Sequence, residues 1–283
     1  MITIVVTGTS SGIGLAIAKR GIERGARVFG TVRSEADAVR VSGELGPGYT
    51  ALICDVRDDA AVARAADTVR AALDGQRLSG LVNNAAAALP GPLLLQPIEE
   101  IRTQIETDLL GPMIVTRAFG PLLGADPTLS GPPGRIVNMS SIGGKLRQPF
   151  ISAYIASKHG IEGWTGTLRR ELQIYGIHVA AVGPGLVDTP IWDKVNSFFG
   201  RYDGTPYEEA FNNGVRIIVE AGKKHGMTAE GVADTVWTAL TEPHPKLRYA
   251  PASHPILEQG VLMAMPQRAI DWGLGFIGLR RKR

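Results

Sequence analysis

Short apolar runs alternate with longer helical patterns along most of this chain, and that alternation constrains the fold more than any other feature. The first run, residues 2–7, is rich in β-branched residues, ends at glycines and precedes a stretch with helical spacing of its apolar residues. Further runs of this kind occupy residues 26–32, 50–54 and 78–85, each followed by a helical pattern. Such alternation predicts an α/β fold with a doubly wound parallel sheet, covered by helices on both faces.

Two later runs, residues 135–140 and 178–185, continue the pattern, and a predicted long helix over residues 98–123 precedes them. In doubly wound sheets, ligands bind beyond the carboxyl ends of the strands, where the strand order reverses. We therefore expect the functional residues to lie directly after strands. After the sixth strand, residues 188–225 depart from this alternation of strands and helices.

Composition narrows the class of protein. A chain of 283 residues with 44% hydrophobic and 20% charged residues can bury a large core, so we expect one catalytic domain over residues 1–255 and a C-terminal extension over 256–283. The single cysteine, Cys54, the absence of a secretion signal and the lack of a long apolar stretch predict a cytoplasmic protein. A net charge of +3 and scattered histidines predict neither nucleic-acid binding nor a metal site.

The segment TGTSSGIG, residues 7–14, follows the first strand and opens the first helix. Gly8, Gly12 and Gly14 would allow a pyrophosphate to approach the backbone and the helix N-terminus, which predicts a dinucleotide site. At the end of the second strand stands Arg33, which favours the 2′-phosphate of NADP over the ribose hydroxyl of NAD. Asp37 lies nearby, so NAD stays an alternative cofactor.

The segment YIASK places Tyr154 and Lys158 four residues apart, so on a helix both side chains share a face. A free phenol has a pKa of about 10, and a tyrosine can exchange protons near neutrality only where its anion is stabilised. Such a pair also arises by chance, so the other motifs in the chain must show whether it is functional. In chain order they are TGTSSGIG, NNA at residues 83–85, NMSS with Ser141, YIASK and PGLVDT at residues 184–189.

Together these segments resemble the short-chain dehydrogenase/reductase family over nearly all of residues 1–250. The resemblance implies a Rossmann-type fold and an enzyme that interconverts C=O and CH–OH groups with NAD(P). It also implies that Tyr154 exchanges a proton with the substrate oxygen, that Ser141 hydrogen-bonds this oxygen, and that Lys158 holds the nicotinamide ribose. The cofactor-binding set predicted in this way is Gly8, Ser10, Ser11, Gly12, Ile13, Gly14, Arg33, Asp55, Val56, Asn83, Ala85, Tyr154, Lys158, Pro184, Gly185, Val187 and Thr189.

Two residues depart from the family pattern. Ala86 follows NNA where the family commonly has a glycine, so the turn there could differ in shape. Asp108 stands where the family has an asparagine that helps to hold a water near the lysine. An ionised aspartate can accept a hydrogen bond but not donate one, and its charge could pair with Lys158 and alter proton relay. We include Asp108 in the predicted catalytic set on the resemblance.

Six aromatic residues gather between Trp192 and Phe211. By resemblance, residues 188–225 cover the substrate, and the rings would suit a lipophilic ketone, aldehyde or alcohol that is steroid-like, retinoid-like or long-chain acyl. The rings could equally complete the core. The closing residues 266–283 mix Trp272 with terminal basic residues and could touch a membrane surface, cap the pocket or pack on a partner.

The predicted function is thus an NADP(H)-dependent oxidoreductase, with an NAD-dependent alcohol dehydrogenase as the alternative within the family. A second alternative is a dinucleotide-binding regulator without turnover, which the departures at Ala86 and Asp108 suggest. The resemblance further implies a homodimer or homotetramer formed through the helices that carry Asp108 and Tyr154.

Overall fold

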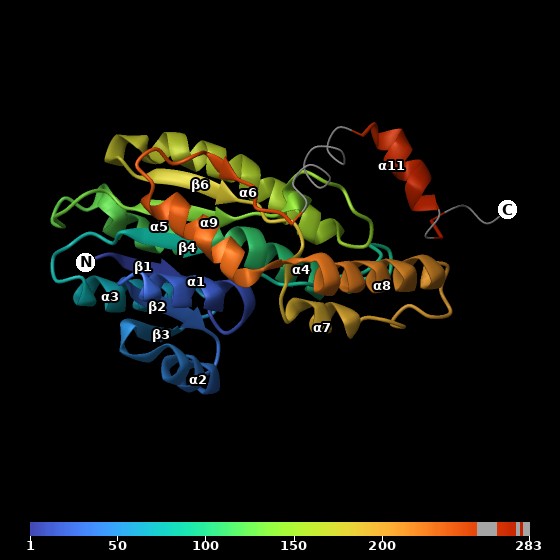
Figure 1. Cartoon of the computed structure of the whole chain (residues 1–283), viewed down its shortest axis with the longest axis horizontal. Helices are drawn as coiled ribbons and strands as arrows, with labels where there is room; N and C mark the ends of the chain where they lie inside the picture. The colour runs from blue at the N-terminus through green and yellow to red at the C-terminus, as the bar shows by residue number, and fades with distance from the viewer. Residues whose placement is uncertain (254–264, 276–277, 280–283) are drawn as a thin grey trace.

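A seven-stranded sheet in the order β3-β2-β1-β4-β5-β6-β9 forms the centre of the computed structural model, which describes residues 1–253, 265–275 and 278–279 (Figure 1). Every pair of neighbouring strands is parallel. The Rossmann-type doubly wound sheet is thereby confirmed. Its strands are β1 (Thr3–Val6), β2 (Arg27–Val32), β3 (Tyr49–Ile53), β4 (Gly80–Asn83), β5 (Arg135–Met139), β6 (His178–Val182) and β9 (Arg248–Tyr249).

Apolar residues pair across the sheet because its central strands are covered on both faces. Val5 of β1 lies opposite Phe29 of β2 and Leu81 of β4. The strand order reverses between β1 and β4, so the segments after these two strands define the crevice where a ligand is expected.

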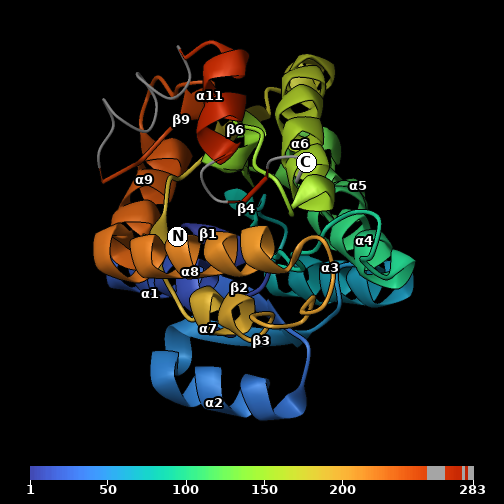
Figure 2. The ribbon, with the colours of Figure 1, turned by 90° about the vertical axis from the view of Figure 1, so that its right-hand side faces the viewer.

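Helices cover the two faces as two separate layers (Figure 2). Helices α1, α2 and α9 bury Ile17, Val41 and Val236 against one face, while α3, α5 and α6 bury Val62, Phe119 and Leu168 against the other. The helices are α1 (Gly12–Glu23), α2 (Glu35–Leu45), α3 (Asp59–Ala72), α4 (Ile98–Ile105), α5 (Gly111–Gly120), α6 (Ser152–Glu171), α7 (Ile191–Asn196), α8 (Glu208–His225), α9 (Ala229–Thr241) and α11 (Gln267–Leu274).

The helix predicted over residues 98–123 is interrupted. A π-helical turn, η2 (Glu106–Leu110), joins α4 to α5, and a second, Pro121–Ala125, follows α5. Single π turns inside helices often occur at functional sites because they reorient one side chain. Here the first π turn contains Asp108.

The segment after β6 forms its own small apolar cluster. Strand β7 (Val187–Asp188) pairs with β8 (Met227–Thr228), and between them α7 and α8 extend beyond one end of the sheet, on the right of Figure 1. Tyr202, Phe211 and Val215 are buried there, and Trp192 and Phe198 pack against them. The aromatic rings therefore hold this segment together, although Phe199 is exposed.

The C-terminal extension is described only in part. The predicted boundary at residue 255 lies outside the described residues, as do residues 280–283 of the basic tail. None of the helices in the described ranges combines the length and apolar character that spanning a bilayer requires. Within the same ranges, no three histidine, cysteine or acidic side chains are grouped so as to hold a metal ion.

Candidate active site

The glycine turn takes a shape that other residues would disturb. Gly8 and Gly12 have φ angles of +71° and +58°, in the left-handed region. A Cβ on Gly8 would also lie 2.9 Å from Cα of Ala85, because the turn after β1 packs directly on the segment after β4. The turn and the predicted residue Ala85 therefore meet at the point where the strand order reverses.

The N-terminus of α1 has room for an anion. Ser11 occupies the N-cap position but its side chain makes no capping hydrogen bond, so the first N–H groups of the helix face outward without that partner. Ser10 and Ile13 flank this end of the helix, and both are half-buried. Thr189 lies beside it, since a Cβ on Gly12 would be 3.4 Å from Cβ of Thr189. These features fit a dinucleotide pyrophosphate.

Asn84, in the segment after β4, contacts the glycine turn but is not among the predicted site residues. Its Nδ2 donates to the carbonyl oxygens of Thr7 and Gly8 at 2.9 and 3.2 Å, and Oγ1 of Thr7 accepts from the backbone N–H of Asn84 and Ala85. These bonds fix the glycine turn to the end of β4. The repeated asparagine in NNA was the available signal.

Arginines crowd the end of the crevice beside β2 and β3. Asp37, the nearby acid, accepts from Arg40 at 2.7 Å and from Ser34, and the Arg40 bond holds the pKa of its carboxyl below the usual value. Arg40 also donates to the carbonyl of Ser10 in the glycine turn at 2.7 Å. The exposed Arg33 is in none of the ion pairs found among the described residues. Asp37 is thus neutralised by another arginine.

Asp55, a member of the predicted cofactor-binding set, is held by a neighbour. Arg57 donates to both of its carboxylate oxygens, with Nε–Oδ1 and Nη2–Oδ2 distances of 3.1 and 2.7 Å, and this lowers the pKa of Asp55. The next residue, Val56, is buried against α5, where a Cβ on Gly111 would lie 2.8 Å from its Cγ2. Sequence analysis did not identify Arg40 or Arg57, although each lies only two or three residues after the acid that it pairs with.

Tyr154 and Lys158 lie near the start of α6, as their spacing predicts. Lys158 is 4% exposed, its Nζ donates to the carbonyl oxygen of Met139 at 3.1 Å, and it lies 5.6 Å from the centre of the Tyr154 ring. A buried ammonium so close to the phenol can stabilise its anion. Its remaining protons are available for another acceptor.

Asp108 meets Lys158 directly. Its Oδ2 lies 3.6 Å from Nζ of Lys158, and both side chains are buried. Oδ1 accepts from the backbone N–H of Ala87 at 2.8 Å. Burial raises the pKa of Asp108, while Lys158 opposes that change. Beside it, Ala86 does not have a positive φ, so the turn needs no glycine there.

Ser141 is both a cap and a neighbour of the tyrosine. Its Oγ accepts from the N–H of Gly143 at 3.0 Å at the start of a short 3₁₀ turn, Ile142–Gly144. A Cβ on Gly143 would be 3.5 Å from this Oγ and 3.0 Å from Cε1 of Tyr154. The glycine therefore separates the two side chains, and the Ser141 hydroxyl keeps its proton to donate. Ser140 instead donates to Glu162 at 2.6 Å.

Hydrogen bonds inside the protein fix Asn83 and the PGLVDT segment. The Asn83 amide is 3% exposed and donates to Thr116 and Asn138 at 2.9 and 2.8 Å, so its side chain gives no support to the predicted cofactor contact. In the segment after β6, the carbonyl of Pro184 accepts from Ile142, the N–H of Gly185 donates to Pro251, and the carbonyl of Val187 accepts from the Trp192 indole. The bond between Pro184 and Ile142 joins the segment to the Ser141 turn.

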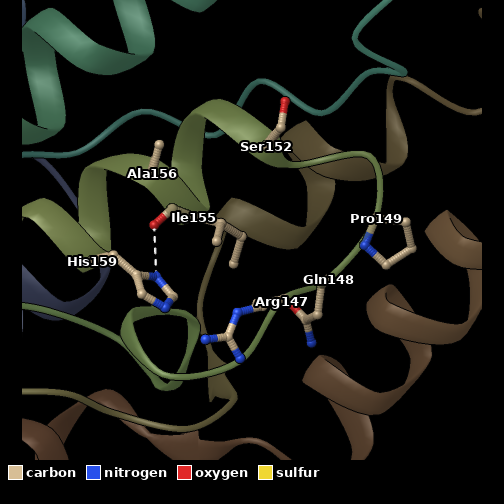
Figure 3. A pocket seen from close by; sticks show the side chains of 7 residues that line it. All are labelled: Arg147, Gln148, Pro149, Ser152, Ile155, Ala156 and His159. Atoms are coloured by element: carbon tan, nitrogen blue, oxygen red, sulfur yellow. Dashed lines mark hydrogen bonds between the residues drawn. The ribbon is translucent and has the colours of Figure 1, made fainter. Parts of the chain in front are cut away.

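An open hollow of about 530 Å³ lies on a different side of α6 (Figure 3). Ile155 and His159 line it, with His159 Nδ1 3.0 Å from the carbonyl oxygen of Ile155. Neither Tyr154 nor Lys158 contributes to its lining, so the hollow is separate from the place where these two side chains meet. Its lining is Arg147, Gln148, Pro149, Ser152, Ile155, Ala156 and His159.

Comparison with known proteins agrees with this geometry. Residues 2–198 match the family model described as short chain dehydrogenase. The chain is similar to an NADPH-dependent 3-dehydrocapnine reductase of Ornithobacterium rhinotracheale, with 35% identity over 267 residues and 94% of each chain covered. It is also similar to retinol dehydrogenase 16 of Homo sapiens, with 30% identity over 258 residues, 87% of this chain and 79% of the relative.

Among solved structures, an actinorhodin polyketide ketoreductase variant with NADPH matches with a TM-score of 0.75 and 30% identity, over 93% of this chain and 98% of the other. The likeness therefore extends through the sheet, the glycine turn and the segments after β5 and β6. Because the family model spans well over half of the sequence, the chain belongs to the short-chain dehydrogenases/reductases, NAD(P)-dependent oxidoreductases that act on CH–OH and C=O groups.

Proposed function

We propose that this enzyme uses NADP(H) to interconvert a lipophilic ketone or aldehyde and its alcohol, with Tyr154 as the general acid/base. The observation that carries the proposal is the buried Lys158, whose Nζ lies 5.6 Å from the centre of the Tyr154 ring, donates to the Met139 carbonyl oxygen and pairs with Asp108. A positive charge in this place favours transfer of the phenol proton to a substrate oxygen.

The residues of the site have separable tasks. NADPH, when bound, supplies the hydride, and the glycine turn with the N-terminus of α1 would hold its pyrophosphate. Ser141 donates a hydrogen bond to the substrate oxygen, since its Oγ already accepts from Gly143. Tyr154 gives its proton to the same oxygen. Lys158 stabilises the phenolate that remains, and Asp108 balances the charge of Lys158.

Preference for NADP rests on the arginines at the ends of β2 and β3. Because Arg40 neutralises Asp37, the acid that could accept from a ribose hydroxyl is already bonded, and Arg33 is left to meet a 2′-phosphate. Two similar proteins, the 3-dehydrocapnine reductase and the polyketide ketoreductase, carry NADPH in their descriptions.

A lipophilic substrate is supported by the segment that extends beyond the carboxyl end of the sheet. We propose that residues 188–225 act as its lid, because Phe150 and the rings of α8 form an apolar wall near the start of α6. The similarity to an enzyme named for retinol points in the same direction.

Consumption of NADPH with a panel of lipophilic ketones and aldehydes tests the activity. Tyr154→Phe should lower kcat by about 10²–10⁴-fold while NADPH still binds, because only the proton donor is removed. Binding of NADPH without Tyr154-dependent turnover of any member of the panel would instead support a regulator.

Parallel titrations with NADPH and NADH test the cofactor. Arg33→Ala should weaken NADPH binding by about 10–100-fold, the loss of a charge-assisted hydrogen bond, and leave NADH within about threefold. Arg24→Ala is a matched control, since Arg24 is an exposed arginine just after the other end of α1. Equal loss for both cofactors, or tighter NADH binding in the native enzyme, would contradict NADP preference.

A further inference from the structure

Phe150, four positions before Tyr154, has a backbone conformation that few residues of its size adopt. Its φ is +66°, and among the described residues other than glycine only Asp74 also has a positive φ. Aspartate visits the left-handed region with less difficulty than a bulky residue, for which this conformation is an outlier. The surrounding fold must therefore stabilise Phe150 in it.

The ring of Phe150 is fixed by α8 and the residue just before it. It meets Phe211 edge to face, with ring centres 5.5 Å apart at 76°, and Tyr207 at 6.2 Å and 87°. Phe211 is fully buried. A Cβ on Gly214, one turn further along α8, would lie 3.7 Å from Cδ2 of Phe150. The side chain thus belongs to the apolar cluster of the α7–α8 segment.

The backbone of Phe150 is fixed by a second segment. Its carbonyl oxygen accepts from the N–H of Gly91 at 2.7 Å, in the loop that follows β4. The next residue, Ile151, is the N-cap of α6 and provides no capping side chain. Because nothing in the N-cap side chain fixes the first turn of α6, the contacts of Phe150 determine where the helix that carries Tyr154 begins.

We propose that Phe150 is a positioning residue that links docking of the α7–α8 segment to the alignment of Tyr154. When α8 packs on the Phe150 ring, the strained backbone is held, α6 begins at its observed place, and the phenol lies beside Lys158. When α8 moves away, the ring loses its partners, the backbone of residue 150 can relax, and the first turn of α6 shifts. The role in turnover rests on the proposed function of Tyr154.

Kinetics of matched variants test the positioning role. Phe150→Gly removes both the ring and the strain, and we expect kcat to fall by about 10–100-fold, as for a small misplacement of a reacting group, with NADPH binding within about twofold. Phe150→Leu keeps an apolar side chain, and its kcat should lie between those of the native enzyme and Phe150→Gly. Tyr175→Leu is the control, because Tyr175 lies in the turn after the far end of α6 and is 42% exposed, and its kcat should be native.

Hydrogen exchange tests the link without any substrate. Phe211→Leu changes only the α8 side of the contact, and we expect amides 153–157 at the start of α6 to exchange at least about tenfold faster through increased local opening. Phe119→Leu, which changes a buried ring of α5 outside the α7–α8 cluster, should leave these amides unchanged.

The outcomes separate this proposal from the proposed function. Native exchange at residues 153–157 in Phe211→Leu, or native kcat in fully folded Phe150→Gly, would overturn it and make Phe150 an ordinary packing residue. If Phe150→Gly does not fold, Tyr207→Leu takes its place, since Tyr207 is only half-buried. Absence of Tyr154-dependent turnover would contradict the function, whereas the exchange result would still decide the link.

Discussion

Gly143 shows how closely the side chains of the site are packed at the scale of single residues. A Cβ there would lie 3.0 Å from Tyr154 Cε1 and 3.2 Å from Ile155 Cδ1, which is tighter than ordinary contact. We expect Gly143→Ala to push the phenol away by a few tenths of an ångström and to lower kcat by about 3–10-fold, because catalysis depends steeply on the distance between reacting groups. Steady-state kinetics with saturating NADPH measures the effect.

Gly163→Ala is the matched control for that substitution. Gly163 lies on the exposed side of α6, and a Cβ there would meet nothing within 4 Å. The alanine should keep native kcat and raise stability by up to about 1 kcal/mol, since alanine is the better helix former. Equal kcat values for the two alanine variants would contradict a steric role for Gly143.

Asp108 makes stability depend on pH in an unusual direction. Burial raises the pKa of this carboxyl above its ordinary value of 3.8, so the native protein binds its proton more tightly than the unfolded chain. This contribution to stability is present below about pH 4 and is lost as the pH rises through the raised pKa. Asp108→Asn removes the dependence and keeps an oxygen for the Ala87 N–H. The variant should therefore gain stability relative to native protein as the pH rises from about 4 to 7, measured by urea unfolding.

Asp126→Asn provides the opposite sign for comparison. Thr128 and Arg70 hydrogen-bond the Asp126 carboxyl and lower its pKa to about 2, so its contribution is present above the ordinary value and is lost as the pH falls through the lowered one. Asp126→Asn should therefore be less stable than the native protein at neutral pH, and this difference in stability should disappear as the pH falls. If both variants changed with pH in the same direction, the buried pair with Lys158 would not behave as described.

Between elements, Glu162 joins α6 to the edge strand β9. Arg248 of β9 donates to Glu162 at 3.0 Å, and Ser140 after β5 donates at 2.6 Å. These groups are mostly shielded from water, so each bond to the charge matters more than a surface pair. We expect Glu162→Gln to lower the free energy of unfolding by about 1.5–3 kcal/mol in urea titrations.

Glu44→Gln is the control for Glu162→Gln. Glu44 is 3.9 Å from Arg40 on the exposed side of α2, with nearly half of its side chain accessible. Its loss should change stability by no more than about 0.5 kcal/mol. A similar small loss for Glu162→Gln would show that β9 does not depend on this ion pair.

The same elements show what the sequence could predict. Runs such as residues 135–140 are long enough for β-branched patterning to identify a strand, and β5 (Arg135–Met139) lies within one residue of that prediction. The strand Arg248–Tyr249 has only two residues and no pattern of its own, since its pairing with β6 depends on the finished sheet. The π turn at Asp108 could not be predicted either, because its residues have the same helical spacing as those of α4 and α5.

Across the whole molecule, motifs after strands predicted which residues would meet, because a parallel sheet brings the carboxyl ends of its strands together. Gly8 meets Ala85, and Gly12 meets Thr189, although the two members of each pair are far apart in sequence. The strain at Phe150 was not predictable, because it depends on tertiary contacts of a loop residue. The pairs of Asp37 with Arg40 and of Asp55 with Arg57 are local in sequence, but the sequence prediction did not use their spacing.

Unfolding of the molecule should follow the separation of its cores. The α7–α8 segment has its own cluster around Phe211, while β1, β4 and β5 share the large cores on the two faces of the sheet. A small cluster opens at a lower free energy than the global core. Native-state hydrogen exchange in low denaturant should therefore find α8 amides opening below the free energy of β5 amides, with a smaller denaturant dependence.

Two valine substitutions make that test decisive. Val219→Ala in α8 and Val137→Ala in β5 remove the same atoms from buried positions, 8% and 0% exposed. Val219→Ala should lower the protection of α8 amides alone, because the sheet does not depend on this cluster. Val137→Ala should lower the protection of the sheet by about 1–3 kcal/mol and leave α8 unchanged until global unfolding dominates its exchange. If Val219→Ala reduced protection in β5 equally, the segment and the sheet would be one cooperative unit, and α8 could not leave the Phe150 ring while the sheet stays folded.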